Sequence, residues 1–553
     1  MTDQADRVRP NRHADTAVDR LRAGYDATPY ACNSFPQSAP GQLAAVAYLF
    51  GMQPAEVPTA RVLEIGCAGG GNIIPFAAAH PRATVVGIDL SQVQIDQGRA
   101  RARALGLDNL DLIAGDIARA ELTALGQFDF IIAHGVYSWV PAEVQDALLA
   151  AVRRLLAPEG VAYLSYNVYP GWKPKEILRD AMLLASGTSV TPDEKVRSAR
   201  RMVDFLGDVA PADGVLARVV AESKTFADSF GDSYLLHDEL ETFNAPCYFY
   251  EMVERAGEHG LAYLADARPE WMIADNYGAE VAEFVREQSA GVQVLIGQYL
   301  DFVANRTFRE TLLVHAERAP QIDYQPDHRR CSRMHVAACL PPIDEPTRLD
   351  YSRQEYRDPD GATLFTNDPG FKAALDELTT QWPWTMSHQQ LLDAVRARLI
   401  SAGLSPSSTL PDHLGNLIAA LIMQGQARFR LDPVWAEPAD EPLQLDESVR
   451  RMVEVSRDGD GAASTFNLWH ETVVLGPLDG HLLPLLDGTR DRGALLRDLL
   501  ASAYEHPVER HGTSASDEND RREVVAEHIE AVAQALAHMK LAGLPRVAGH
   551  RPL

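Results

Sequence analysis

The stretch from residue 61 to 91, RVLEIGCAGGGNIIPFAAAHPRATVVGIDLS, constrains the fold more than any other part of the chain. An apolar run breaks into glycines at position 66 and positions 69–71, and a second apolar run ends on Asp89. Glycines placed directly after a strand let the backbone turn sharply and let a ligand approach it closely. We therefore expect a strand, a ligand-binding turn, a helix and a second strand, in this order.

Short apolar and β-branched runs alternate with amphipathic stretches from about residue 60 to residue 167. The runs are RVLEIG, TVVGIDL, LDLIAGD, FDFIIAHG and GVAYLSYN, and the helical stretches include SQVQIDQGRARARALGL and AEVQDALLAAVRRLLAP. Alternation of this kind is typical of βαβ units in a parallel sheet. The pattern predicts an α/β fold with a doubly wound sheet of five strands. The segment LAYLADA at 261–267 is a candidate for a further strand of the same sheet.

The length of the chain predicts several domains. At 553 residues it exceeds what one hydrophobic core ordinarily spans. Apolar residues at helical spacing dominate after the sheet region, and a Pro- and Asp-rich stretch that begins IDYQPDHRR marks a boundary. A pattern of helix, helix and short β wing follows, and then an acidic linker. We expect an N-terminal lid at 1–57, a doubly wound core at 58–170, a helical middle domain at 171–330, a winged-helix-like module at 331–436 and a second helical C-terminal module of related shape at 437–553.

Composition and charge disfavour several function classes. The formal net charge of -26 disfavours nucleic-acid binding, because affinity for phosphate backbones comes largely from Lys and Arg. The same argument disfavours DNA binding by the winged-helix-like module. No run approaches the roughly 18 apolar residues of a membrane span. The charged N-terminal segment carries no secretory signal, which predicts a cytoplasmic protein. The five cysteines contain no CxxC pair, so no metal site is expected.

The spacing of the glycine turn distinguishes between two classes of nucleotide-binding protein. A dinucleotide-binding turn follows the pattern G-x-G-x-x-G. Here Gly66, Ala68 and Gly70 are more closely spaced, and Glu64 lies two residues before the first glycine. This arrangement resembles motif I of the class I S-adenosylmethionine-dependent methyltransferases, E/D-x-G-x-G-x-G, with Ala68 in place of the middle glycine. The fold that this resemblance implies is a Rossmann-like methyltransferase domain.

The resemblance extends along the domain and implies where the methyl donor binds. Asp89 ends the second run, where the family's acid accepts hydrogen bonds from the ribose hydroxyls, and Asp116 follows the third, where the acid contacts the adenine amino group. Each acid taken alone is also a common turn or helix-terminus residue. The implied donor is S-adenosylmethionine, its product is S-adenosylhomocysteine, and no metal is required. The implied donor-binding residues are Tyr25, Tyr30, Glu64, Gly66, Cys67, Ala68, Gly70, Asp89, Leu90, Asp116, Ile117 and His134.

A narrower resemblance covers most of the chain. The segments YDATPY, YLSYNVYPGW, LLHDELETFNAPCYFYEMVERAGEHGLAYLADA and LLPLLDGTRDRGALL are similar to segments of bacterial methyltransferases that carry a methyltransferase regulatory domain. That group includes rickettsial enzymes that methylate lysines of an outer-membrane protein. The resemblance therefore implies a polypeptide substrate, although the family is less specific for its acceptor than for its donor.

Polar and aromatic residues follow the fourth and fifth runs, at the sheet edge where open α/β folds bind ligands. His134 is a candidate general base, with a backbone-bonded or helix-capping histidine as the alternative. Trp139 and Trp172 either line the acceptor site or pack in a core. The motif D/N-P-P-Y is absent after FDFII, which disfavours a DNA adenine methyltransferase. The candidate catalytic residues are His134, Tyr137, Trp139, Tyr166 and Asn167.

Three hypotheses follow for the acceptor. In the first, the chain N-methylates lysine side chains of a protein, whose positive charge suits the acidic surface. In the second, it is a small-molecule O- or N-methyltransferase of secondary metabolism, whose extra modules form a homodimer or dock a carrier protein. In the third, it is a donor-binding regulator without transfer activity; the intact residues Glu64, Gly66, Gly70 and Asp89 argue against lost donor binding but not against lost transfer.

Overall fold

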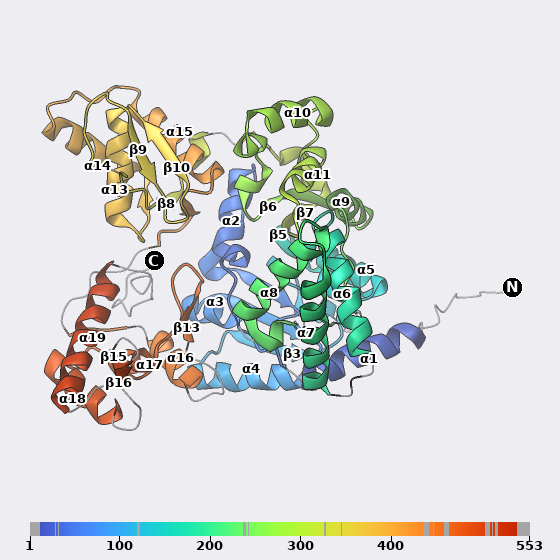
Figure 1. The fold of residues 1–553 in the computed structure, drawn as a ribbon. Coiled ribbons are helices and arrows are strands. Elements are labelled where there is room, and N and C mark those ends of the chain that lie inside the picture. The colour runs from blue at the N-terminus through green and yellow to red at the C-terminus, as the bar shows by residue number, and fades with distance from the viewer. Residues whose placement is uncertain are drawn as a thin grey trace.

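The computed structural model describes residues 12–538 with short gaps (Figure 1). The first eleven residues of the predicted lid lie outside this range. Among the described residues, no helix is both long enough and apolar enough to cross a membrane. The gaps are residues 28, 31–32, 119–121, 188, 190, 236–238, 242, 326–327, 344–345, 435–441, 446, 458–463, 504–508, 511–512 and 515–517.

A mixed sheet of seven strands forms the centre of the molecule, in the order β3-β2-β1-β4-β5-β7-β6. The first five strands in the chain are parallel, as predicted, and β7 pairs antiparallel with both β5 and β6. Of the two further strands, β6 was predicted as a candidate addition and β7 was not predicted. The segment LAYLADA does join the sheet, but at its outer edge, with β7 between it and β5. The strands are β1 (Arg61–Ile65), β2 (Thr84–Asp89), β3 (Leu110–Ala114), β4 (Phe128–Ala133), β5 (Leu156–Asn167), β6 (Leu261–Asp266) and β7 (Phe308–His315).

Alternating residues of the strands face two separate apolar cores. Val62 and Tyr163 belong to the core on one face of the sheet, whereas Leu63 and Leu164 belong to the core on the other. Because side chains alternate between the faces of a strand, burial on both faces explains the nearly continuous apolar runs. One face is covered by α2 (Pro40–Leu49), α3 (Ile73–Ala79) and α4 (Gln92–Leu105), and the other by α5 (Ala142–Leu155) and α9 (Phe249–Glu258).

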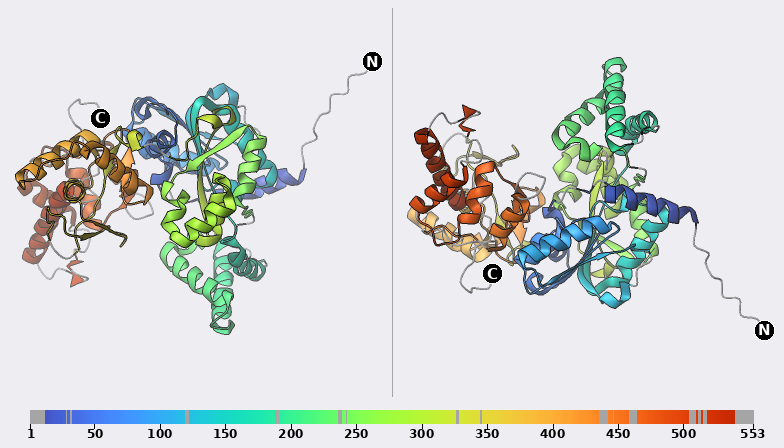
Figure 2. Two further views of the ribbon diagram at one scale, coloured as in Figure 1. Left: turned by 90° about the horizontal axis from the view of Figure 1, so that it is seen from above. Right: turned by 90° about the horizontal axis from the view of Figure 1, so that it is seen from below.

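Three helices form an arm that projects from the central sheet, and Figure 2 shows this arm extending away from the rest of the molecule. The arm has its own apolar cluster, which includes Leu178, Val196 and Val219. Its helices begin directly after β5, so the arm starts beside the carboxyl edge of the sheet. They are α6 (Trp172–Ser186), α7 (Pro192–Val209) and α8 (Val215–Tyr234).

A buried ion cluster ties the two added strands to α11 (Gln293–Ala304), the helix that follows α10 (Ala279–Ser289). Arg309 on β7 is fully buried, and its Nη1 donates to both oxygens of Asp266, at 3.0 and 2.8 Å. Its Nε donates to Asp301 Oδ2 at 2.9 Å and its Nη2 to the Gly297 carbonyl at 2.9 Å. The guanidinium is thus neutralised by two carboxylates and fully engaged.

The module after the sheet has the helix, helix and short wing that its sequence predicts. A three-stranded sheet in the order β11-β8-β12 packs with helices α12–α15, and its apolar core is continuous with one core of the seven-stranded domain. A separate hairpin pairs β9 with β10. The elements are α12 (His328–Cys331), β8 (His335–Ala337), β9 (Gln354–Arg357), β10 (Thr363–Thr366), α13 (Pro369–Gln381), β11 (Met386–Ser387), α14 (His388–Ser401), α15 (Leu410–Met423) and β12 (Arg428–Arg430).

The last module packs around a third apolar core, which also includes Ile74 and Leu105 of the seven-stranded domain. Its first helix, α16, lies against α4, and its hairpin β13–β14 reaches the start of α3 (Figure 1). The module is therefore docked on the seven-stranded domain rather than tethered at a distance. Its elements are α16 (Glu447–Arg457), β13 (Ser464–Phe466), β14 (Thr472–Val474), α17 (Pro477–Leu482), α18 (Arg492–Ala503), β15 (Glu509–Arg510), β16 (Thr513–Ser514) and α19 (Glu518–His538).

Candidate functional site

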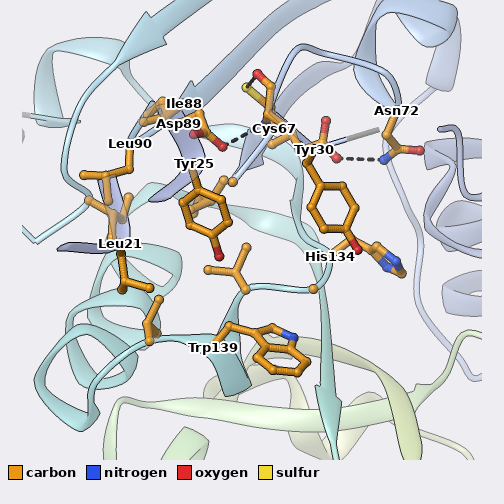
Figure 3. Close-up of a pocket in the computed structure, with 18 of the residues that line it drawn as sticks. Leu21, Tyr25, Tyr30, Cys67, Asn72, Ile88, Asp89, Leu90, His134 and Trp139 are labelled. Carbon is orange, nitrogen blue, oxygen red and sulfur yellow. Dashed lines mark hydrogen bonds between the residues drawn. The ribbon is translucent and has the colours of Figure 1, made fainter. Parts of the chain in front are cut away.

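A cavity of about 450 Å³ opens at the carboxyl ends of β1, β2 and β4 (Figure 3). It is lined by every predicted donor-binding residue except Gly70, whose neighbour Gly71 takes part instead. Of the predicted catalytic residues, His134, Trp139 and Asn167 also line it. The structure therefore brings most of the predicted site together in one place.

The turn between β1 and α3 has the backbone geometry that its glycines imply. Gly66 and Gly70 have φ values of 76° and 78°, a region that favours glycine. A Cβ on Gly66 would lie 2.3 Å from Val136 Cγ2, so this position has no room for a side chain. Ala68, which replaces the family's middle glycine, has a φ of 49°. The amide of Ala68 donates to Asp89 Oδ2 at 2.8 Å, which holds this residue in its unusual conformation.

Asp89 links the glycine turn to the end of β2. Its Oδ2 accepts from the Ala68 amide and its Oδ1 from the Ser91 amide, each at 2.8 Å. Burial raises the pKa of Asp89, and the amide hydrogen bonds act against that shift. Because each carboxylate oxygen has a further lone pair and the residue lines the cavity, both oxygens can also accept from a ligand hydroxyl.

Glu64 is the most deeply buried acid of the site. Its Oε1 accepts from Asn72 Nδ2 at 2.8 Å, while its Oε2 is buried without a hydrogen-bond partner among the described residues. Burial raises the pKa of Glu64 to about 8, so the carboxyl group is protonated at neutral pH. A buried carboxyl group with one unpartnered oxygen at a cavity fits a cationic or hydrogen-bond-donating ligand group.

The loops after β2 and β3 form the next part of the wall. Leu90 and Ile117 contribute apolar side chains beside Asp116. Asp116 Oδ1 accepts from the Ala118 amide at 2.9 Å, which stabilises the loop after β3. An apolar surface next to a carboxylate is suited to a flat aromatic ring that carries an amino group.

The N-terminal segment, with α1 (Arg12–Ala27), covers the cavity. Figure 3 shows the rings of Tyr25 and Tyr30 between the glycine turn and Trp139. The Tyr30 amide donates to Gln94 Oε1 at 3.0 Å, which ties the segment to α4. The segment therefore provides a wall on the side that the sheet leaves open.

The remaining wall of the cavity is aromatic. Trp139 and Trp172 line it in an edge-to-face pair with ring centroids 6.2 Å apart, and Phe308 lies on the same wall. Both tryptophans therefore contribute to the cavity as well as to packing. Asn167 also lines it, and its Nδ2 donates to Asn244 Oδ1 at 2.9 Å.

His134 is held between the aromatic wall and the sheet. Its ring stacks on Phe35 with centroids 3.8 Å apart, and its Nδ1 lies 3.0 Å from Tyr163 Oη and 3.2 Å from Ser165 Oγ. Burial lowers the pKa of His134 to about 4, so the imidazole is neutral at physiological pH. Because two hydroxyl groups surround Nδ1, Nε2 is the nitrogen through which His134 can meet a ligand.

Tyr137 and Tyr166, both predicted as catalytic, do not line the cavity. Both are buried in the core on the other face of the sheet, where Tyr166 Oη lies 2.9 Å from Thr311 Oγ1 and Tyr137 Oη accepts from Arg255 Nη1 at 3.3 Å. Successive side chains on a strand point to opposite faces, so Asn167 and Tyr166 cannot both reach the cavity. We correct the prediction accordingly: these two tyrosines support the fold beneath the site.

Comparisons with known proteins cover nearly the whole chain. A methyltransferase domain model matches residues 62–160, a predicted methyltransferase regulatory domain matches residues 231–315, and a PKMT C-terminal winged helix domain matches residues 449–541. An uncharacterized protein of Rickettsia prowazekii is 30% identical over 484 residues, which are 86% of this chain and 85% of that protein. The chain belongs to the class I S-adenosylmethionine-dependent methyltransferases with a regulatory domain. The predicted family, fold class and enzyme class are thereby confirmed.

A solved structure and a second sequence relative show how far along the chain the similarity of this methyltransferase to rickettsial proteins extends. PKMT2 from Rickettsia typhi in complex with AdoHcy is 26% identical with a TM-score of 0.80, over 93% of this chain and 99% of that chain. A second uncharacterized protein of Rickettsia prowazekii is 34% identical over 236 residues, which are 42% of this chain and 94% of that protein. The likeness to PKMT2 therefore extends well beyond the Rossmann-like domain.

S-adenosylmethionine is the methyl donor of this methyltransferase, and the cavity fits it. When bound, the donor supplies a sulfonium methyl group. The unpartnered Glu64 Oε2 suits its amino group, the outward lone pairs of Asp89 suit the ribose, and the apolar surface beside Asp116 suits the adenine. Within the described part of the chain, no group of three His, Cys, Asp or Glu side chains is arranged to hold a metal ion.

Donor binding should release a proton from Glu64. With a pKa of about 8, Glu64 is protonated in roughly 90% of the molecules at pH 7. The ammonium group of a bound donor lies next to this carboxyl group and favours its ionised form. Because binding releases this proton, donor affinity should rise with pH between 6 and 7. A free α-amino group stays protonated in this range, so the rise reports on Glu64. Calorimetry of S-adenosylhomocysteine binding in buffers of different ionisation enthalpy measures the release. A release that persists in Glu64→Gln would contradict the assignment.

Several lining residues were absent from the predicted site. Asn72 begins α3 and makes no side-chain cap, because its amide group contacts Glu64 and residues from other segments instead. The position of this Asn directly after the glycines was the sequence signal that could have identified it as a site residue. Phe35, Gln94, Phe308 and Lys175 gave none, because each reaches the cavity through tertiary packing.

Proposed function

We propose that the chain transfers methyl groups from S-adenosylmethionine to lysine side chains of a polypeptide. The observation that carries the proposal is the likeness to PKMT2 across the Rossmann-like domain, the regulatory domain and both C-terminal modules. Modules of this size around one small-molecule cavity are suited to holding a polypeptide. The net charge of -26 further favours a lysine-rich partner, because opposite charge speeds association.

In this proposal the acids of the cavity hold the donor. Asp89 accepts from the ribose hydroxyls, Asp116 accepts from the adenine amino group, and Glu64 pairs with the amino group of the methionine part. Leu90 and Ile117 pack against the adenine. Tyr25 and Tyr30 cover the bound donor and exclude water, which aligns donor and acceptor for an in-line displacement.

The aromatic wall receives the acceptor. Trp139, Trp172 and Phe308 present ring faces and edges that accommodate a lysine stem and its developing positive charge. Lysine has a reference pKa of about 10.4, so its amine must lose a proton before transfer. His134, neutral because burial lowers its pKa to about 4, accepts a hydrogen bond from the neutral amine through Nε2 and orients the lone pair toward the methyl group. The proton itself leaves through water.

The proposal is tested by transfer of labelled methyl from S-adenosylmethionine into a lysate of the native host, separated into macromolecular and small-molecule fractions. We expect label on protein and, after acid hydrolysis, on methylated lysine. The matched control is the same protein fraction with its lysine amines acetylated beforehand, which should take up little label. Label found solely in the small-molecule fraction would replace this proposal with a small-molecule O- or N-methyltransferase.

A further inference from the structure

The hairpin β13–β14 of the last module contacts the catalytic domain directly behind the donor cavity. Its turn carries His470, which is 8% exposed and has a φ of 63°. His470 Nε2 lies 2.9 Å from Asn72 Oδ1, and Thr472 Oγ1 accepts from the Ser34 amide at 2.9 Å. Figure 1 shows β13 beside α3, whose N-cap position is Asn72. A residue almost 400 positions away thus contacts the glycine turn.

Asn72 connects this hairpin to both ends of the site. Its Nδ2 donates to Glu64 Oε1 at 2.8 Å and to Ser38 Oγ at 3.0 Å, and its Oδ1 accepts from the Phe35 amide at 2.9 Å. Phe35 in turn stacks on His134. One amide group therefore contacts the acid at the donor end and the segment that covers His134.

The partners of Asn72 determine the orientation of its amide group and the tautomer of His470. A backbone N–H can only donate, so the atom of Asn72 that faces the Phe35 amide is the oxygen. His470 contacts this same oxygen, so its Nε2 carries the proton and donates. The buried imidazole is neutral, because burial and the nearby Arg430 lower the pKa of His470 to about 3. His470 is therefore a fixed donor at this position.

We propose that His470 is a positioning residue for the methyl donor, through which the C-terminal module completes the donor site. Its Nε2–H holds Asn72 Oδ1, so that Asn72 Nδ2 remains on Glu64 Oε1 and leaves Glu64 Oε2 directed to the donor's amino group. Without this hydrogen bond, Asn72 Oδ1 loses one of its two strongest donors and the amide group can rotate away from Glu64. The inference concerns donor binding and does not depend on which acceptor is methylated.

The test compares two substitutions in the full-length protein. His470→Gln places an amide nitrogen where Nε2 lies, whereas His470→Asn is too short to reach Asn72 but tolerates positive φ well. We expect His470→Asn to weaken S-adenosylhomocysteine binding about 5- to 10-fold, the effect of one lost hydrogen bond, and His470→Gln to bind within about twofold of the native protein. Calorimetry gives the affinities, and thermal melting verifies that both variants fold. In kinetics, the KM for S-adenosylmethionine should rise in His470→Asn while kcat stays within about twofold.

Arg428→Gln is the matched control for the docking of the hairpin. Arg428 Nη2 pairs with Glu471 Oε1 at 2.7 Å, next to His470 in the turn. Arg428 lies on β12 of the preceding module, so this substitution weakens a second anchor of the same hairpin without touching Asn72, and donor affinity should stay close to native. The proposal is overturned if His470→Asn binds the donor as the native protein does, if His470→Gln is as weak as His470→Asn, or if Arg428→Gln loses as much affinity as His470→Asn.

Discussion

Replacing Asp89 by Ala should weaken S-adenosylhomocysteine binding about 100-fold or more. Two hydrogen bonds from ribose hydroxyls to a carboxylate contribute roughly 3 kcal/mol together, and 1.4 kcal/mol corresponds to a factor of ten. Asp89 also accepts from the amides of Ala68 and Ser91, so its loss loosens the turn that faces the donor. Isothermal calorimetry on the full-length protein measures the change.

Two further variants make the Asp89 result specific. Asp89→Asn keeps the shape of the side chain and removes its charge, so we expect an intermediate loss. Asp96→Ala removes an exposed acid of α4 that pairs with Arg99 and does not line the cavity, so donor affinity should not change. Native affinity in Asp89→Ala would mean that the ribose lies elsewhere.

Replacing Arg309 by Met should lower the free energy of unfolding by about 3–5 kcal/mol. The substitution leaves Asp266 buried without a counter-charge, and Asp301 keeps only its pair with Arg306 Nε, at 2.8 Å. The shape of Met fits an apolar core, so the effect comes mainly from the unpaired carboxylate of Asp266. Urea denaturation followed by fluorescence measures the loss, which should concern β6, β7 and α11 first.

Two further variants test this explanation: an Arg→Met substitution at an exposed ion pair, and a variant in which the unpaired charge is also removed. Arg492→Met breaks an exposed pair with Glu530, which should change stability by at most about 1 kcal/mol. Adding Asp266→Asn to Arg309→Met should recover a large part of the lost stability, because a neutral amide costs less to bury than a carboxylate, while Asp301 keeps Arg306 as its partner. If the double variant is no more stable than Arg309→Met, lost packing rather than charge accounts for the effect.

The strands of the catalytic core could be predicted because their signals are local. Strands β1 to β5 are apolar runs separated by amphipathic helices, and both properties are visible within a few residues. Strand β7 carries Arg309 and Glu310, whose burial makes sense only once Asp266, Asp301 and Arg268 are in place. A pairing between residues 167 and 308 leaves no local pattern to detect.

The candidate site also has a part that local sequence predicts and a part that depends on tertiary contacts. Glu64, Gly66 and Asp89 lie in a short motif whose spacing resembles a known family, and the structure places them at one cavity. Tyr166 is an aromatic residue at the carboxyl end of the fifth run, which predicts a place at the site, but the strand alternates its side chains and buries this ring on the other face. The contact of His470 with Asn72 joins segments from opposite ends of the chain and could not be anticipated.

The position of β7 between β5 and β6 has a consequence for synthesis on the ribosome. β5 ends at Asn167 and β7 ends at His315, so about 150 residues must be added before the sheet can close. At roughly 5–20 residues per second, this takes about 7 to 30 s, during which the backbone edge of β5 has no neighbour to cover it. The nascent methyltransferase domain would therefore be a client for chaperones during this interval. A fragment ended near residue 170 would keep that edge permanently and should collect in inclusion bodies.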